Sequence, residues 1–352
     1  MLDNDYRRSL FYPKADLPLA NDVLRGGGTA ALGESVIAQI CADVLQRKVT
    51  AVEPLEPGTF HRLWRVRRES EPPVIFRVNA FSDWFRDDML GMDVIAGKLL
   101  RQRGFSAVHV HAVDLTRERC PVDFSIMDEA RGTSLRAFDH DEVKLLPLLT
   151  ELGRFTANIH RIDLRCRFGL IDPSALATGR GPLFGLHETW DEYIALNLEE
   201  HVKICVGIGA VSDEEAQRIL WLFEGCRGIY ADSIPKLLHG DPGNHNVFVE
   251  DGQITALIDW EDAVAGDPVY EIAFWATFHP ERRHAAFLEG YRSEATLPPD
   301  FEPRFWLYFL RVSLAKTVLR HRLGLKDKPG REPASRRIQK SLHHLKAACG
   351  LA

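Results

Sequence analysis

The sequence predicts an α+β protein of two lobes, a small one built on an antiparallel sheet and a larger, mainly helical one. Residues 49–80 hold three short runs of β-branched and aromatic residues separated by turns, which is typical of antiparallel strands. Beyond residue 132 the apolar residues recur at helical spacing, and only one hairpin pattern interrupts them. The length of 352 residues exceeds that of a usual single domain, which also favours two lobes.

The expected small lobe spans residues 35–127 and follows an N-terminal extension, residues 1–34, that contains a run of three glycines. Its first helix starts at Ser35, a candidate N-cap, and is expected to bury Val36 and Ile40. The remaining elements of this lobe are the three strands within 49–80, a helix over 84–103, and strands over 108–114 and 123–127.

A hinge at residues 128–132 is expected to join this lobe to the helical lobe at 133–352. The helical lobe contains no internal repeat, and a polar linker at 324–333 precedes its last helix. The apolar spacing predicts helices over 141–160, 188–204, 212–230, 279–323 and 335–348.

Charge and composition narrow the classes of partner. A net charge of −6 and a pI of about 6.2 argue against a general nucleic-acid binder and against a polybasic protein of the membrane surface. The chain shows no apolar leader and no apolar run long enough to span a bilayer, and its six cysteines form no CxxC pair. We expect a cytoplasmic monomer or homodimer that acts on a small molecule.

The most informative stretch is HGDPGNHNVFVEDGQITALIDWEDAVAGDP, residues 239–268. Two β-runs flank Asp251-Gly252, a dipeptide typical of a type I′ hairpin turn. Asp241 and Asp259 lie at the open end of this hairpin, and Asn246 lies just inside it. The spacing from Asp241 to Asn246 is that of the kinase catalytic loop H-R-D-x-x-x-x-N.

These residue types suit phosphoryl transfer, which depends on positioning and charge neutralisation more than on covalent chemistry. The Asp259 carboxylate and the Asn246 amide oxygen are hard ligands of the kind that Mg²⁺ prefers. Asp241, left free of metal, is the candidate general base that accepts the proton of the substrate hydroxyl. A structural hairpin with aspartates in Asx turns is the simpler interpretation of the same residues.

The motifs HGDPGNHN and LIDWEDAVAGDPVYEIA together resemble the aminoglycoside phosphotransferase family of small-molecule kinases. Within that family, their residue pattern is most similar to that of the hygromycin B phosphotransferases. The resemblance implies a bilobal protein-kinase-like fold, with ATP and Mg²⁺ as cofactors. It further implies that Asp241 is the catalytic base and that Asn246 and Asp259 are metal ligands. A catalytically inactive nucleotide-binding scaffold, or a kinase of a metabolite such as an amino alcohol or a sugar, is the alternative.

The resemblance also implies nucleotide-binding roles in the small lobe. Gly58 lies between two predicted strands, where the family covers the phosphates, although a plain hairpin turn explains it too. Arg77 takes the place of the lysine that holds the α- and β-phosphates, and Asp93 that of its carboxylate partner. Met127 and Glu129 fall on the strand and hinge that face the adenine. Two other carboxylates are alternatives to Asp93, namely Asp87 and Asp88.

A cationic acceptor such as an aminoglycoside requires an acidic cleft. Acidic residues occur on both sides of the catalytic loop, and tryptophans are candidates for stacking on a sugar face. Each is also explained as a helix-surface or core residue. The predicted acceptor contacts are Glu192, Glu261, Asp262 and Trp275, and further candidates are Glu188, Trp190, Asp191, Glu199 and Glu200.

The segment Gly266-Asp267-Pro268 resembles the part of the family in which an aspartate supports the catalytic loop, although a helix N-cap explains Asp267 as well. Glu271 stands where most members have a further aspartate. His160 matches a helix-ending motif and is expected to be structural. The chain lacks H-R-D, D-F-G and A-P-E, so a protein kinase is not expected.

Overall fold

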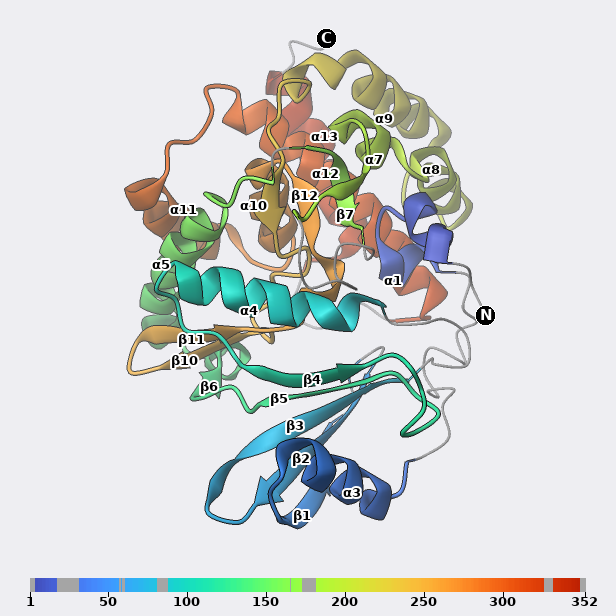
Figure 1. The fold of residues 1–352 in the computed structure, drawn as a ribbon. Helices are drawn as coiled ribbons and strands as arrows, with labels where there is room; N and C mark the ends of the chain where they lie inside the picture. Colours follow the sequence, from blue (N-terminus) through green and yellow to red (C-terminus); the bar gives the residue numbers. More distant parts are fainter. Residues whose placement is uncertain are drawn as a thin grey trace.

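The computed structural model describes residues 4–17, 32–56, 58, 61–80, 88–164, 166–172, 182–325 and 332–348. A small lobe built on a sheet adjoins a larger helical lobe (Figure 1), which confirms the predicted α+β class. One hydrophobic cluster lies between the sheet and its helix, and a larger one fills the helical lobe. Across the described part of the chain, every helix is too short or too polar to cross a bilayer.

Five antiparallel strands form the sheet of the small lobe, in the order β1-β2-β3-β5-β4. Helix α3 (Glu34–Leu45) packs on it through buried residues that include Ile37 and Cys41. Ile40 is buried as expected, but Val36 is 41% exposed, and the N-cap is Gly33 rather than Ser35. The strands are β1 (Val49–Pro54), β2 (His61–Arg68), β3 (Glu71–Asn79), β4 (Val110–Asp114) and β5 (Phe124–Asp128).

The helix expected over 84–103 is α4 (Met92–Gln102), which a 3-10 turn, η2 (Asp88–Gly91), precedes. Residues 81–87, and with them the candidate Asp87, lie outside the described residues. Helix α4 lies between the sheet and the helical lobe (Figure 1) and contacts η5 (Trp260–Asp262) directly after Asp259. This contact brings the start of α4 to the predicted catalytic residues.

The helical lobe contains the helices expected from apolar spacing, with one correction. The helix expected over 188–204 is broken in two, because Asn197 adopts a left-handed φ of 56° between α7 and α8. The helices are α5 (Glu142–Ile159), α7 (Trp190–Ala195), α8 (Leu198–Gly207), α9 (Asp213–Gly225), α10 (Pro268–Ala276), α11 (Glu281–Glu294), α12 (Phe301–Arg322) and α13 (Ala334–Ala348), with 3-10 turns η3 (Leu135–Phe138) and η4 (Arg227–Ile229). The short strands are β6 (Thr133–Ser134), β7 (Phe168–Ile171), β8 (Gly185–His187), β9 (Lys236–Leu238) and β12 (Val264–Gly266).

The predicted hairpin is present as β10 (Val247–Glu250) and β11 (Gln253–Leu257), paired antiparallel. Asp251 and Gly252 have φ values of 50° and 77°, as a type I′ turn requires at both central positions. At the open end Ile258 donates its N–H to the carbonyl of Asn246, at 3.0 Å. The hairpin therefore sets the distance between the two ends that carry Asp241 and Asp259.

The N-terminal segment, residues 4–17, packs on the helical lobe rather than leading into the sheet. It forms a 3-10 turn η1 (Asn4–Ser9) and a one-turn helix α1 (Pro13–Asp16), which lies against α12 (Figure 1). Five of its apolar residues belong to the core of the helical lobe: Leu10, Phe11, Tyr12, Ala15 and Leu17. Sequence periodicity did not predict this placement.

Candidate active site

The catalytic loop runs from β9 to β10, residues 239–246, and its backbone is fixed by a glycine that no other residue can replace. Gly240 has a φ of 83°, and a Cβ there would lie 1.7 Å from the carbonyl oxygen of Asp262. The Asn246 amide donates to the carbonyl of Asp241 at 2.9 Å. His239 Nε2 lies 2.8 Å from the carbonyl of Ile258, which ties the loop to the end of β11. These contacts hold Asp241 and Asn246 in one rigid turn.

Glu271, and not Asp267, holds this loop in place through a hydrogen bond to its backbone. Glu271 is fully buried, accepts the Gly240 N–H at 2.9 Å and lies 3.0 Å from Nε2 of His160. Asp267 instead caps α10 and accepts hydrogen bonds from Tyr308 and Arg304. The expectation for Asp267 is therefore wrong, and its N-cap alternative is confirmed. The longer glutamate side chain one helical turn later reaches the loop.

Asp259 follows β11 with a φ of 71°, a left-handed conformation that is uncommon for a residue with a side chain. Its carboxylate accepts a hydrogen bond from Arg77 of the small lobe at 2.7 Å. Burial raises the pKa of Asp259, but the cations Arg77 and Lys14 outweigh burial, and the pKa is lowered overall. The group is therefore ionised and suited to bind a cation.

Arg77 on β3 lies at the centre of a cluster of carboxylates. Its guanidinium lies 2.9 Å from Asp93 on α4, 2.7 Å from Asp259 and 2.8 Å from Glu261. Asp93 is 3% exposed, and burial raises its pKa in spite of the Arg77 charge. The structure thus brings Arg77 and Asp93 together as expected, and it adds His61, whose Nε2 lies 3.2 Å from Glu261.

Lys14 is a residue that sequence reasoning missed. Its ammonium reaches from α1 to the catalytic loop and lies 2.7 Å from Asp241 and 3.0 Å from Asp262. Burial raises the pKa of Asp241, but Lys14 and then His245 counteract burial, and the pKa of Asp241 is lowered overall. Lys14 is separated from Asp241 by 227 residues, so no local motif could have revealed the contact.

The predicted nucleotide-binding residues Gly58, Met127 and Glu129 belong to the loop between β1 and β2, to β5, and to the segment directly after β5. Gly58 donates its N–H to the carbonyl of His61 at 3.0 Å, while residues 57, 59 and 60 of the same loop lie outside the described residues. Met127 is buried on β5, and Glu129 just beyond it pairs with Arg65 at 2.9 Å. The contact of Gly58 with the phosphates and those of Met127 and Glu129 with adenine stay predictions.

The acceptor candidates divide into two groups. Glu261 and Asp262 lie next to the candidate catalytic residues, where they pair with Arg77 and Lys14 respectively. Burial, together with neighbouring carboxylates, raises the pKa of both groups.

The side chains of Glu192 and Trp275 make structural contacts instead, one in a helix cap and the other in the core. The carboxylate of Glu192 completes the capping box of α7 with Thr189. Trp275 is 1% exposed and stacks on the rings of His279 and Phe287, so it is a core residue and the expected sugar contact is wrong. The further candidate Trp190 is also buried.

The donor atoms at the open end of the hairpin fit a hard divalent cation. Single ligand atoms of His61, Asp259 and Glu261 lie within 4.8 Å of one another. Because Asn246 uses its amide nitrogen for the Asp241 carbonyl, its amide oxygen is the atom of this side chain that can bind a cation. Carboxylate and amide oxygens suit Mg²⁺ better than softer metals.

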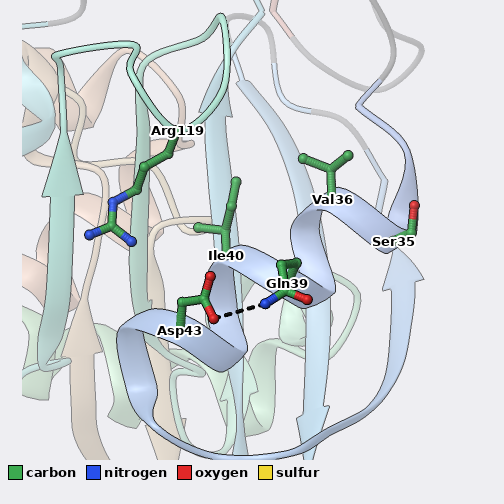
Figure 2. A pocket seen from close by; sticks show the side chains of 6 residues that line it. All are labelled: Ser35, Val36, Gln39, Ile40, Asp43 and Arg119. Atoms are coloured by element: carbon green, nitrogen blue, oxygen red, sulfur yellow. Dashed lines mark hydrogen bonds between the residues drawn. The ribbon is translucent and has the colours of Figure 1, made fainter.

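A pocket on the small lobe lies away from these groups (Figure 2). It is formed by one face of α3 and a side chain from the loop after β4. The lining side chains are Ser35, Val36, Gln39, Ile40, Asp43 and Arg119. Gln39 donates a hydrogen bond to Asp43 at 2.8 Å, and none of these residues is a candidate for the reaction.

A sequence model of the phosphotransferase enzyme family matches residues 51–307, which include the sheet, the hinge and the whole hairpin. The chain belongs to this family. The protein-kinase-like fold expected from the motifs is confirmed by its structural neighbours.

Hygromycin-B 4-O-kinase of Escherichia coli is 27% identical over 260 residues, which cover 68% of this chain and 66% of that protein. The matched region thus spans slightly less than two thirds of that relative's length. Among solved structures, a thermostable mutant of APH(4)-Ia in ternary complex with AMP-PNP and hygromycin B has a TM-score of 0.63 at 20% identity, covering 88% of this chain and 98% of that chain. A GDP and kanamycin complex of APH(2″)-IIIa has a TM-score of 0.59 at 16% identity, covering 89% and 98%.

Proposed function

We propose that this protein transfers the γ-phosphoryl group of a nucleoside triphosphate to a hydroxyl group of a small molecule. The observation that carries the proposal is the convergence of Asp241, Asn246 and Asp259 at the open end of one hairpin, on a backbone held by buried contacts. Family membership supports the same reaction class. A structural hairpin would not need an ionised, left-handed Asp259 that pairs with Arg77 of the small lobe.

Each residue has a separate task in this reaction. Asp241 accepts the proton of the acceptor hydroxyl, and the Glu271 contact to Gly240 keeps its loop in place. Asn246 and Asp259 would hold Mg²⁺, which neutralises charge on the phosphate oxygens when bound. Arg77 would leave Asp259 for the phosphates while Asp93 keeps it oriented, since a guanidinium binds phosphate through two parallel hydrogen bonds.

The nucleotide and the acceptor are inferred from relatives. The complexes of neighbours with AMP-PNP and with GDP make ATP the first nucleotide to test and GTP the second. Hygromycin B is the first acceptor to test, because it is the substrate named for a relative and is bound by a neighbour. Phosphorylation of such an antibiotic would confer resistance. We further expect a cytoplasmic monomer or homodimer without nucleic-acid or membrane partners.

The decisive experiment measures nucleotide consumption with a panel of aminoglycosides, amino alcohols and sugars, and locates the new phosphate by NMR. We expect Mg²⁺-dependent turnover of at least one acceptor, and loss of that turnover in Asp241→Asn. Nucleotide binding without turnover of any acceptor would favour an inactive scaffold and contradict the proposal. Turnover limited to sugars or amino alcohols would keep the reaction and replace the acceptor.

A further inference from the structure

The ammonium of Lys14 lies between the carboxylates of Asp241, the proposed base, and Asp262, at 2.7 and 3.0 Å. Its side chain is 11% exposed, and those of Asp241 and Asp262 are 8% and 6% exposed, so water screens these charges little. Burial lowers the pKa of Lys14, but Asp241 and Asp262 outweigh burial and raise it well above its ordinary value. Lys14 is therefore a permanent cation beside the catalytic base.

The segment that carries Lys14 is an integral part of the helical lobe. The Asp16 carboxylate accepts the N–H groups of Phe11 and Tyr12 at 2.7 and 2.8 Å. The same carboxylate lies 2.6 Å from His201, and Tyr193 donates to the Phe11 carbonyl at 2.8 Å. Buried polar contacts of the residues on both sides of Lys14 therefore fix this segment in place. It differs in this respect from a loosely held segment that an incoming substrate would displace.

The surroundings of Asp241 show what an incoming acceptor meets. Any hydroxyl that gives its proton to Asp241 must approach within hydrogen-bond distance of that carboxylate. Lys14 already holds Oδ2 of Asp241 at 2.7 Å, and Nε2 of the half-exposed His245 lies 3.9 Å from the same oxygen. A second ammonium at this place would face Lys14 and two carboxylates that are already paired, and like charges in contact are strongly disfavoured.

We propose that Lys14 is a specificity-determining residue that takes the place of an acceptor ammonium. This inference rests on the proposed kinase activity and narrows its acceptor: the substituent next to the phosphorylated hydroxyl is neutral or anionic. An aminoglycoside remains a substrate when its amino groups are remote from that hydroxyl. Selection acts through charge, so removing the Lys14 charge makes the site attractive to an adjacent ammonium.

The test compares acceptors in matched pairs that differ only by a hydroxyl or an ammonium beside a reactive hydroxyl, such as glucose and glucosamine, or kanamycin A and kanamycin B. The kcat/KM ratio of the amino member to the neutral member is measured in wild type, Lys14→Gln, Lys14→Met and Lys14→Arg. Arg8→Met is the matched control, because Arg8 lies on the same segment and donates to the carbonyl of Leu186 instead. Thermal melting checks that each variant is folded.

We expect the ratio to rise at least about tenfold in Lys14→Gln and Lys14→Met, and to stay near wild type in Lys14→Arg and Arg8→Met. An unchanged ratio overturns the proposal. An equal rise in kcat/KM for both members of a pair also overturns it, because Lys14 would then only obstruct the site. An equal fall in kcat/KM for both members overturns it too, because Lys14 would then only hold Asp241 in place. If no variant phosphorylates any pair, the proposed function fails, and the ratio of calorimetric dissociation constants for the same pairs decides the inference about Lys14.

Discussion

Removal of the Glu271 carboxylate tests whether the catalytic loop depends on one buried side chain. Glu271 is 2% exposed and satisfies both the Gly240 N–H and His160 Nε2, at 2.9 and 3.0 Å. Glu271→Ala leaves both partners buried without an acceptor. Breaking a buried pair of this kind costs about 3–5 kcal/mol of the free energy of unfolding.

That cost converts into a measurable melting shift. An unfolding entropy of about 2.1 cal/mol/K per residue gives roughly 0.7 kcal/mol/K for a chain of 352 residues. The expected fall in Tm is therefore about 4–7 °C for Glu271→Ala. We expect a smaller fall for Glu271→Gln, which keeps one carbonyl acceptor and loses the charge.

Calorimetry and a coupled kinase assay on the same preparations check both consequences. Because a displacement of about 1 Å at the reacting group costs roughly 100-fold, kcat of Glu271→Ala should fall by that order while the affinity for nucleotide is nearly kept. Glu281→Ala is the matched control: its side chain is 74% exposed, it pairs with Lys340, and the change should stay within about 0.5 kcal/mol. A Tm of Glu271→Ala within about 1 °C of wild type, or unaltered kcat, would refute the reasoning.

Three further predictions concern the candidate catalytic residues and one buried histidine. Asp241→Asn keeps the shape of the base and removes its charge, so kcat should fall about 10²-fold or more while nucleotide affinity changes by less than about threefold in calorimetry. Asp259→Ala should abolish turnover and Asn246→Ala should reduce it less, because water can replace one amide ligand; activity of Asp259→Ala equal to wild type at saturating Mg²⁺ would contradict this. Burial lowers the pKa of His201, so the unfolded chain binds more protons there below about pH 6.5, and the stability it contributes is fully present above that pH and is lost on acidification. Tm should therefore fall from about pH 7 to about pH 5, with a shallower slope in His201→Gln, and an equal slope in both proteins would assign the loss to other groups.

Local patterns sufficed for the parts of this protein in which neighbouring residues interact. The hairpin follows from Asp251-Gly252, since few residues other than Asn, Asp and Gly tolerate positive φ at both turn positions. The turn and the strand lengths then bring Asp241, Asn246 and Asp259 to one end. The strand runs of the small lobe and the apolar spacing of the helices likewise fixed the fold class, because periodicity shows which face of an element is buried.

Only the tertiary structure decided the contacts between residues far apart in the chain. The burial of Trp275 depends on which elements pack together, and so does the fact that Glu271 rather than Asp267 hydrogen-bonds the loop at Gly240. Amino-acid composition does not determine that packing. The clearest case is Lys14: a lysine in a short N-terminal turn is ordinarily a solvated charge, and nothing near it in sequence sets it apart. It becomes a buried partner of Asp241, the proposed catalytic base, because Phe11 and Tyr12 enter the core of the helical lobe and carry it there.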